Sequence, residues 1–210
     1  MIKGFDASHW DNIDWDNLSP DFKFVFLKGS QGQTYHDPVF QDNWKAARDK
    51  GLLHGEYGFW VPRINPQLQA NNFLNRGVDW SLAGVLPPVI DIENQTDGSD
   101  KYILANKSEC RDNALQLLEA VEIGAGKTPI VYCSPHFLQE YLGDSKPFAK
   151  YGLWIAGYQP TVPHLPDGFS NWVFWQQSEY GTQQGALTGG HLDIDWFNGD
   201  IGELNKLANL

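Results

Sequence analysis

Short apolar runs alternate with longer segments in which apolar residues recur every three or four positions, over roughly the first two thirds of the chain. The short runs predict buried strands and the longer segments predict amphipathic helices. A repeated strand-then-helix order is typical of βα units that form a parallel sheet. The pattern predicts eight strands, at residues 2–6, 24–29, 55–60, 89–93, 129–133, 153–157, 172–177 and 192–196.

Helical periodicity is confined to the first part of the chain. Pro66 suits the first position of a helix, and Ser108 is a suitable N-cap residue. The predicted helices cover residues 37–50, 66–80 and 108–123.

The last third has a different composition between its strands. Pro160, Pro163 and Pro166, with many glycines and polar residues, occupy the gaps where helices would otherwise be expected. We therefore expect loops or hairpins there. The predicted fold is an α/β, irregular TIM-like barrel with eight strands and fewer than eight helices, formed by residues 1–210 as a single domain.

Composition narrows the possible partners. The net charge of −11 disfavours nucleic acid, and 41% hydrophobic residues argue against disorder. No apolar run is long enough to cross a bilayer, and the opening "MIKGFDASHW" lacks the apolar core of a signal peptide. We expect no membrane partner and no secretion signal in this chain. Cys110 and Cys133 are expected to be buried free thiols.

The stretch "LPPVIDIENQ" places two carboxylates at the end of a predicted strand. Asp91 and Glu93 are two positions apart, so both side chains leave the same face, about 6.6 Å apart along the strand. Ile90 and Ile92 face the other way. Because the carboxyl ends of barrel strands carry the chemistry in βα barrels, this pair is a candidate for an active site.

Other acidic residues occur in similar positions. Asp6 closes "IKGFD", and Asp193 and Asp195 lie in "HLDIDWF". The first and last strands are neighbours in a closed barrel, and the fourth lies across from them, so the acids meet only if the barrel closes. Such a cluster could raise one carboxyl pKa for general-acid work, bind Mg²⁺ or Ca²⁺, or consist of helix caps and solvated strand ends.

Other kinds of site find less support. The six histidines are scattered without HExxH spacing, no GxSxG occurs, and "KGSQGQ" lacks the spacing of a phosphate-binding loop. Aromatic residues lie at the ends of several predicted strands, including Tyr57, Tyr132 and Trp154. Most aromatic side chains belong to cores, but rings beside acids also suit the flat apolar faces of sugars.

Several segments, in order along the chain, resemble glycoside hydrolase family 25 lysozymes, the Chalaropsis-type N-acetylmuramidases. The resemblance implies an irregular β/α barrel and hydrolysis of the β-1,4 bond between N-acetylmuramic acid and N-acetylglucosamine. It also implies peptidoglycan glycan strands as the partner, no cofactor or metal, and action outside the cell at the bacterial wall, as by a phage endolysin. The matching segments are "GFDASHW", "FVFLKGSQGQTYHDPVFQDNWKAARDKGLLHGEYGFW", "PPVIDIE", "PIVYCS", "LWIAGY", "FWQQSEYG" and "LDIDWFNGD".

The resemblance also implies roles for residues. Glu93 corresponds to the general acid, Asp91 to a carboxylate that orients the substrate's N-acetyl group, and Asp195 to a structural residue. Two positions depart from the family pattern, since Gly58 replaces a histidine and "WQQS" lacks a tyrosine after its first glutamine. The implied catalytic residues are Asp6, Asp91, Glu93 and Asp193, and the implied substrate-binding residues are Tyr57, Tyr132, Trp154 and Gln176.

Three other functions remain open on the sequence. A chitinase-like N-acetylglucosaminidase would share the D-x-E pair, and a metal-dependent phosphodiester hydrolase would use the acids as ligands. A catalytically silent carbohydrate-binding barrel would keep the aromatic residues and lose the acids. Within the muramidase reading, either the substrate's acetamido group or an enzyme carboxylate attacks the sugar. The chain is expected to act as a monomer.

Overall fold

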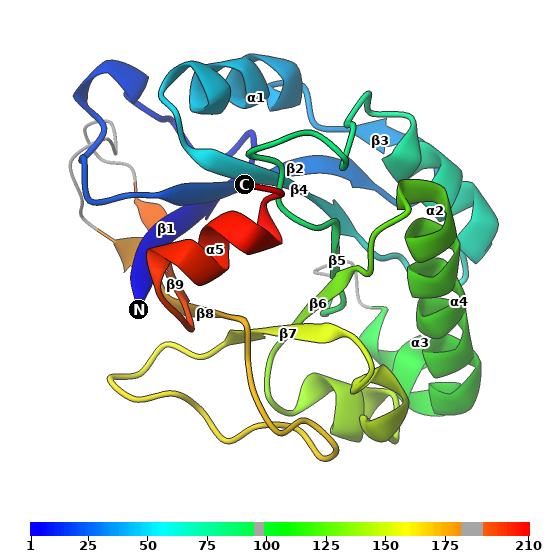
Figure 1. Ribbon diagram of the computed structural model, residues 1–210. Coiled ribbons are helices and arrows are strands. Elements are labelled where there is room, and N and C mark those ends of the chain that lie inside the picture. Colours follow the sequence, from blue (N-terminus) through cyan, green and yellow to red (C-terminus); the bar gives the residue numbers. More distant parts are fainter. Residues whose placement is uncertain (95–98, 182–190) are drawn as a thin grey trace.

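Eight strands close into a barrel in the computed structural model, which describes residues 1–94, 99–181 and 191–210 (Figure 1). Pairing between the first two strands closes the ring, so the predicted fold is confirmed. The polar loop expected after Glu93 lies partly outside the described residues. The barrel strands are β1 (Ile2–Ala7), β2 (Phe24–Gln31), β4 (Leu53–Phe59), β5 (Val89–Asp91), β6 (Ile130–Cys133), β7 (Gly152–Ala156), β8 (Phe174–Gly181) and β9 (Leu192–Phe197).

The helices are fewer than eight in the part of the chain that the structure describes, as predicted. The three expected helices are present, but α3 and α5 and the two-residue strand β3 (Tyr35–His36) were too short to be predicted from periodicity. Ser108 lies inside α4, not at its N-cap, because α3 leads into α4 through Asn106. The α-helices are α1 (Phe40–Asp49), α2 (Pro66–Leu74), α3 (Asp100–Ala105), α4 (Lys107–Ala125) and α5 (Ile201–Leu207), and shorter helical turns are Trp15–Asn17, Phe137–Tyr141 and Lys146–Phe148.

The last strand runs against its neighbours. β9 is antiparallel to both β1 and β8, while the other barrel pairs are parallel. Only residues 182–191 separate β8 from β9, which is too short for the crossover that a parallel pair needs. The start of β9 therefore lies at the same edge as the ends of the parallel strands. This corrects the expectation that every acid lies at the carboxyl end of its strand, since Asp193 is near the beginning of β9 and pairs with Asp6.

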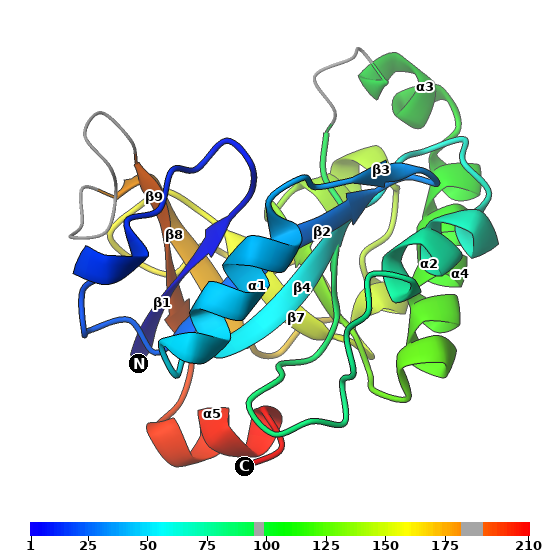
Figure 2. The same ribbon diagram turned by 90° about the horizontal axis from the view of Figure 1, so that it is seen from above.

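Aromatic rings fill the interior of the barrel. Phe174 lies 5.0 Å from both Phe24 and Phe26 between ring centroids, and Phe26 lies 4.8 Å from Trp154. Helix α5 closes one end, opposite α3 (Figure 2), and its Leu204 packs into this interior cluster. The barrel interior is therefore filled with apolar side chains, which leaves the end away from α5 for polar side chains.

The outer layer buries the opposite faces of the strands against α2 and α4. Ile90 and Ile92 are fully buried there, as their alternation with Asp91 and Glu93 predicted. Cys110 and Cys133 are buried and free, which confirms that prediction. Among the described helices, none combines the length and the apolarity that a membrane crossing requires.

A buried glutamic acid on β4 lies against a glycine on the neighbouring strand β2. Glu56 of β4 is fully buried, and neither of its carboxylate oxygens has a hydrogen-bond partner among the described residues. A Cβ on Gly29 would lie 2.0 Å from Glu56 Oε1, and the β2–β4 register shifts between Lys28 and Ser30. Burial raises the pKa of Glu56 well above its usual value, against the pull of Arg76. Gly29 is therefore required to make room for the Glu56 carboxyl.

We expect Gly29→Ala to lower the free energy of unfolding by about 1–3 kcal/mol, because the added methyl group overlaps Glu56. In a Glu56→Ala background the same change should cost clearly less, since the colliding carboxyl is absent. A double-mutant cycle from denaturant unfolding measures this coupling. Equal costs in the two backgrounds would contradict the proposed contact.

Candidate active site

A pocket of about 300 Å³ opens at the end of the barrel away from α5. All eight residues predicted from the sequence as catalytic or substrate-binding line it. They come from strands far apart in the chain, so closure of the barrel brings them together. The lining residues are Asp6, Ser8, Trp10, Lys28, Tyr57, Phe59, Asp91, Glu93, Tyr132, Trp154, Tyr158, Gln176, Glu179 and Asp193.

Asp91 is the last residue of β5 and lies in register between Phe59 of β4 and Tyr132 of β6. It is buried, and its Oδ1 has no hydrogen-bond partner among the described residues. Burial, and then the neighbouring charge of Glu93, raise the pKa of Asp91 well above its usual value, while Lys28 opposes them. Asp91 is thus a desolvated carboxyl in the pocket wall, and its Oδ1 is left unpaired among the described residues.

Glu93 follows the end of β5 and is half-buried at the pocket wall. Burial raises its pKa to about 7; Lys28 lowers it and the charge of Glu179 raises it. A carboxyl with this pKa is protonated in an appreciable fraction of molecules near neutral pH. Glu93 can therefore donate a proton as a general acid and accept one afterwards.

Gln176 of β8 connects two tyrosines to two acids. Its Oε1 accepts hydrogen bonds from the hydroxyls of Tyr132 at 2.7 Å and Tyr158 at 3.0 Å. Its Nε2 donates to Asp6 Oδ2 at 2.7 Å and to Asp193 Oδ2 at 3.1 Å. Because both ends of the buried amide are used, its orientation is fixed, and it holds the two carboxyls from β1 and β9 side by side.

A third acid lies beneath this pair. Asp195 is fully buried, and its Oδ1 accepts a hydrogen bond from Trp154 Nε1 at 2.8 Å. Burial and the adjacent Asp195 raise the pKa of Asp6, while burial and Asp193 raise that of Asp195. Both pKa shifts favour the protonated forms of Asp6 and Asp195, because burial and neighbouring carboxylates disfavour their negative charges. Burial, followed by Asp6, raises the pKa of Asp193 to about 9.

The structure adds pocket residues that the sequence did not single out. Lys28 lies at a strand end like the acids, but it was considered only as part of a possible phosphate loop. Glu179 lies late in β8 and was not considered as a site residue. Tyr158 follows β7 and was considered only as one of the aromatic residues that flank predicted strands. Trp154 is only 2% exposed and its ring packs on Phe26, so it contributes an edge to the floor and no free face.

The clustered acids do not form an evident metal centre. Within the described ranges, no group of three or more His, Cys, Asp or Glu side chains is arranged to hold a metal ion. Lys28 contributes a positive charge to the same pocket, and its Nζ donates to Gln31 at 3.0 Å. The arrangement is suited to proton transfer between carboxyls and a neutral polar substrate.

Comparison with known proteins gives a consistent result. The model of Glycosyl hydrolases family 25 matches residues 5–186. The Uncharacterized protein YegX of Escherichia coli strain K12 is 35% identical over 215 residues, covering 99% of this chain and 74% of that protein. Lysozyme M1 of Streptomyces globisporus is 30% identical over 213 residues, covering 99% and 71%. The crystal structure of the bacterial lysozyme from Streptomyces coelicolor superposes with a TM-score of 0.92 at 29% identity, covering 99% and 97%.

We expect a carbon-13 NMR titration to place the midpoint of the Glu93 carboxyl at about 7, with the signal assigned by its loss in Glu93→Gln. Lys28→Met should move the midpoint to higher pH, because it removes a charge that favours the carboxylate. Glu179→Gln should move it to lower pH, because it removes a repelling charge. Shifts of the same sign in the two variants would refute this electrostatic account.

We expect Asp195→Asn to change how stability depends on pH. Because the pKa of Asp195 is raised in the folded state, the unfolded chain loses its proton first, and stability declines as pH rises above about 4. The asparagine can still accept from Trp154 Nε1 without titrating. The free energy of unfolding of Asp195→Asn, relative to that of the unsubstituted protein, should therefore increase as the pH rises from about 4 to about 8. Thermal or denaturant unfolding measures this difference. Asp21→Asn, at an exposed position, controls for net charge, and a curve for Asp195→Asn parallel to that of the unsubstituted protein would contradict the raised pKa of Asp195.

Proposed function

The chain belongs to Glycosyl hydrolases family 25, and from that premise we propose that it is a lysozyme, an N-acetylmuramidase that hydrolyses peptidoglycan. The bond cleaved is the β-1,4 linkage between N-acetylmuramic acid and N-acetylglucosamine. The observation that carries the proposal is the pair of acids at the end of β5, in which Glu93 has a pKa of about 7. Glycoside hydrolysis needs a carboxyl that is still protonated at working pH beside a second carboxylate.

Glu93 acts as the proton donor in this proposal. Its carboxyl protonates the glycosidic oxygen as the bond from that oxygen to the sugar C1 breaks. The resulting carboxylate then takes a proton from a water molecule, and that water's oxygen attacks C1. The same residue thus serves as acid and then as base, which is appropriate to a pKa of about 7.

Asp91 assists through the substrate's own acetamido group. The acetamido oxygen attacks C1 as the leaving oxygen departs, and water later displaces it, so the anomeric configuration is retained. The attack places positive charge on the acetamido group, whose N–H needs an acceptor. Asp91 Oδ1 is a buried acceptor without a hydrogen-bond partner in the described parts of the chain, which supports its assignment to this N–H.

The remaining residues bind and orient the sugar. Asp6 and Asp193, held by Gln176, present hydrogen-bonding groups to sugar hydroxyls at the pocket floor. Tyr57 lines the pocket, and Tyr132 acts mainly by holding Gln176. Trp154 supports Asp195 from below. We further propose that residues 1–210 form one catalytic domain that acts as a monomer at the bacterial wall, without a cofactor or metal.

Digestion of purified peptidoglycan followed by mass spectrometry of the soluble muropeptides tests the reaction. N-acetylmuramic acid should appear at the new reducing ends. Glu93→Gln should reduce the rate by about 10²–10⁴-fold, because an amide cannot deliver the proton as the carboxyl does. Asp91→Asn should reduce it by about 10²–10³-fold through loss of the carboxylate charge near the developing cation.

Both variants should keep the circular dichroism spectrum and melting temperature of a folded protein, because each amide has nearly the same shape and size as the acid that it replaces. Lysis by Glu93→Gln near the unsubstituted rate would overturn the assignment of the acid. N-acetylglucosamine at the new reducing ends, or preferential cleavage of chitin oligosaccharides, would favour the chitinase-like alternative. Loss of activity in EDTA would favour a metal-dependent hydrolase.

A further inference from the structure

A tryptophan at the pocket rim is unusually exposed. Trp10 is 83% exposed, more than any other large hydrophobic side chain among the described residues. It follows β1 and lines the catalytic pocket. A large aromatic surface left in water is costly unless it has a binding role, and aromatic rings with an exposed face are suited to stacking against sugars.

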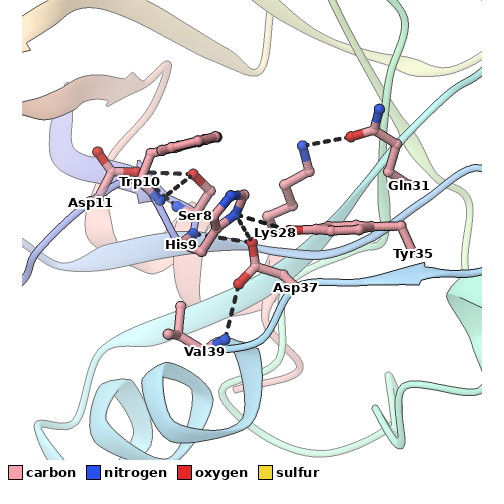
Figure 3. A network of polar contacts seen from close by, with 9 residues as sticks. All are labelled: Ser8, His9, Trp10, Asp11, Lys28, Gln31, Tyr35, Asp37 and Val39. Atoms are coloured by element: carbon pink, nitrogen blue, oxygen red, sulfur yellow. Dashed lines mark hydrogen bonds and ion pairs between the residues drawn. The ribbon is translucent and has the colours of Figure 1, made fainter.

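The backbone that carries Trp10 is firmly held (Figure 3). The backbone N–H of Trp10 donates to Ser8 Oγ at 3.2 Å, and that of His9 donates to Asp37 Oδ2 at 3.0 Å. The His9 ring lies 4.4 Å from the Trp10 ring between centroids, and its Nδ1 is 2.7 Å from Asp37 Oδ2.

The anchor of this network is buried. The Asp37 side chain is inaccessible to solvent, and its Oδ1 accepts from the backbone N–H of Val39 immediately before α1. The hydroxyl of Tyr35 lies 3.1 Å from His9 Nδ1, which adds a second ring to the same unit. The exposed tryptophan is therefore presented by an ordered support, and less conformational freedom is lost when a ligand binds it.

A second groove, of about 520 Å³, continues from the catalytic pocket on the other side of Trp10. Trp10 and Lys28 line both cavities, so a single polymeric ligand can extend from one cavity into the other. We call this second cavity the Trp10 groove. Its lining combines apolar surface from Val61 and Ile64 with amide and hydroxyl groups such as those of Gln31.

The charges of the two cavities differ. Five carboxylic acids line the catalytic pocket, whereas no Asp or Glu lines the Trp10 groove among the described residues. An uncharged ligand with apolar faces and polar edges fits such a lining better than a cationic group does. An N-acetylhexosamine ring has these properties, and neighbouring rings of a glycan strand would be carried into the groove by their attachment to the sugar in the pocket.

We propose that Trp10 and the Trp10 groove form an additional saccharide-binding subsite, in which Trp10 stacks on an N-acetylhexosamine ring of the strand being cleaved. This inference rests on the proposed glycan hydrolysis and deepens it. The subsite lets the protein hold a long strand while a bond in the catalytic pocket is cut. Trp10 then determines how strongly the protein prefers long glycan strands over short ones.

The test compares Trp10→Ala, Trp10→Phe and the unsubstituted protein on glycan strands of increasing length from which the peptides have been removed. The ratio of KM for Trp10→Ala to KM for the unsubstituted protein should be about three- to tenfold larger for long strands than for the shortest strand cleaved. Trp10→Phe should recover most of this loss because it keeps an aromatic face. Ile123→Ala, at a position 78% exposed on α4, is the matched control for loss of an exposed apolar side chain and should show no dependence on length.

Binding provides a second measurement that does not require turnover. In the Glu93→Gln background, long strands should quench tryptophan fluorescence and bind more weakly when Trp10 is replaced by alanine. A KM ratio independent of strand length would overturn the subsite while leaving the proposed function intact. Failure of the unsubstituted protein to cleave any strand would instead refute the proposed function. A Trp10→Ala defect seen only on strands that retain their peptides would assign the groove to the peptide stem and overturn the saccharide assignment.

Discussion

Desolvation of carboxyl groups above a filled apolar barrel is the constraint on which the rest of this structure depends. Phe26, Phe174 and Trp154 occupy the interior directly beneath the acids, so little water can reach the acids from below. Burial is the largest cause of the raised pKa at Asp91 and at Glu93. An ionised carboxylate in such a place is unfavourable, and the protein responds by keeping protons and by supplying hydrogen-bond donors.

The direction of β9 determines how these acids meet. In a barrel of eight parallel strands, a residue at the start of the last strand would lie at the end closed by α5. Because β9 is antiparallel, Asp193 instead pairs with Asp6 at the open end. The same reversal brings Asp195 below the pair, where it meets Trp154. Gln176 from the adjacent β8 then has two carboxyls within reach, so a change in strand direction produces the hydrogen-bonded floor of the pocket.

Much of the fold and the site could be predicted from the sequence, because period-two alternation places Asp91 and Glu93 on one face and the apolar runs mark the strands. The direction of β9 could not be predicted, since it depends on a short connection and on tertiary pairing. Helix α5 has only seven residues and lacks a long periodic pattern. Lys28 was considered in the sequence only as part of a possible phosphate loop, and only the closed barrel places it beside the acids. The sequence suggested a sugar-stacking face for Trp154, whereas packing on Phe26 leaves only its edge exposed to the pocket.

In the proposed mechanism, protonation of the acids at the pocket floor favours the work of Glu93 near neutral pH. If every acid in the pocket were ionised, the carboxylates would repel one another, and all of them would compete for the nearby cation, Lys28. The raised pKa values of Asp6, Asp193 and Asp195 reduce that negative charge. Lys28 then interacts with the charges of Asp91, Asp37 and Glu93, and its own charge keeps the pKa of Glu93 from rising further. In the proposed mechanism, the buried acids at the floor therefore help to set the range of pH over which Glu93 can both give and recover its proton.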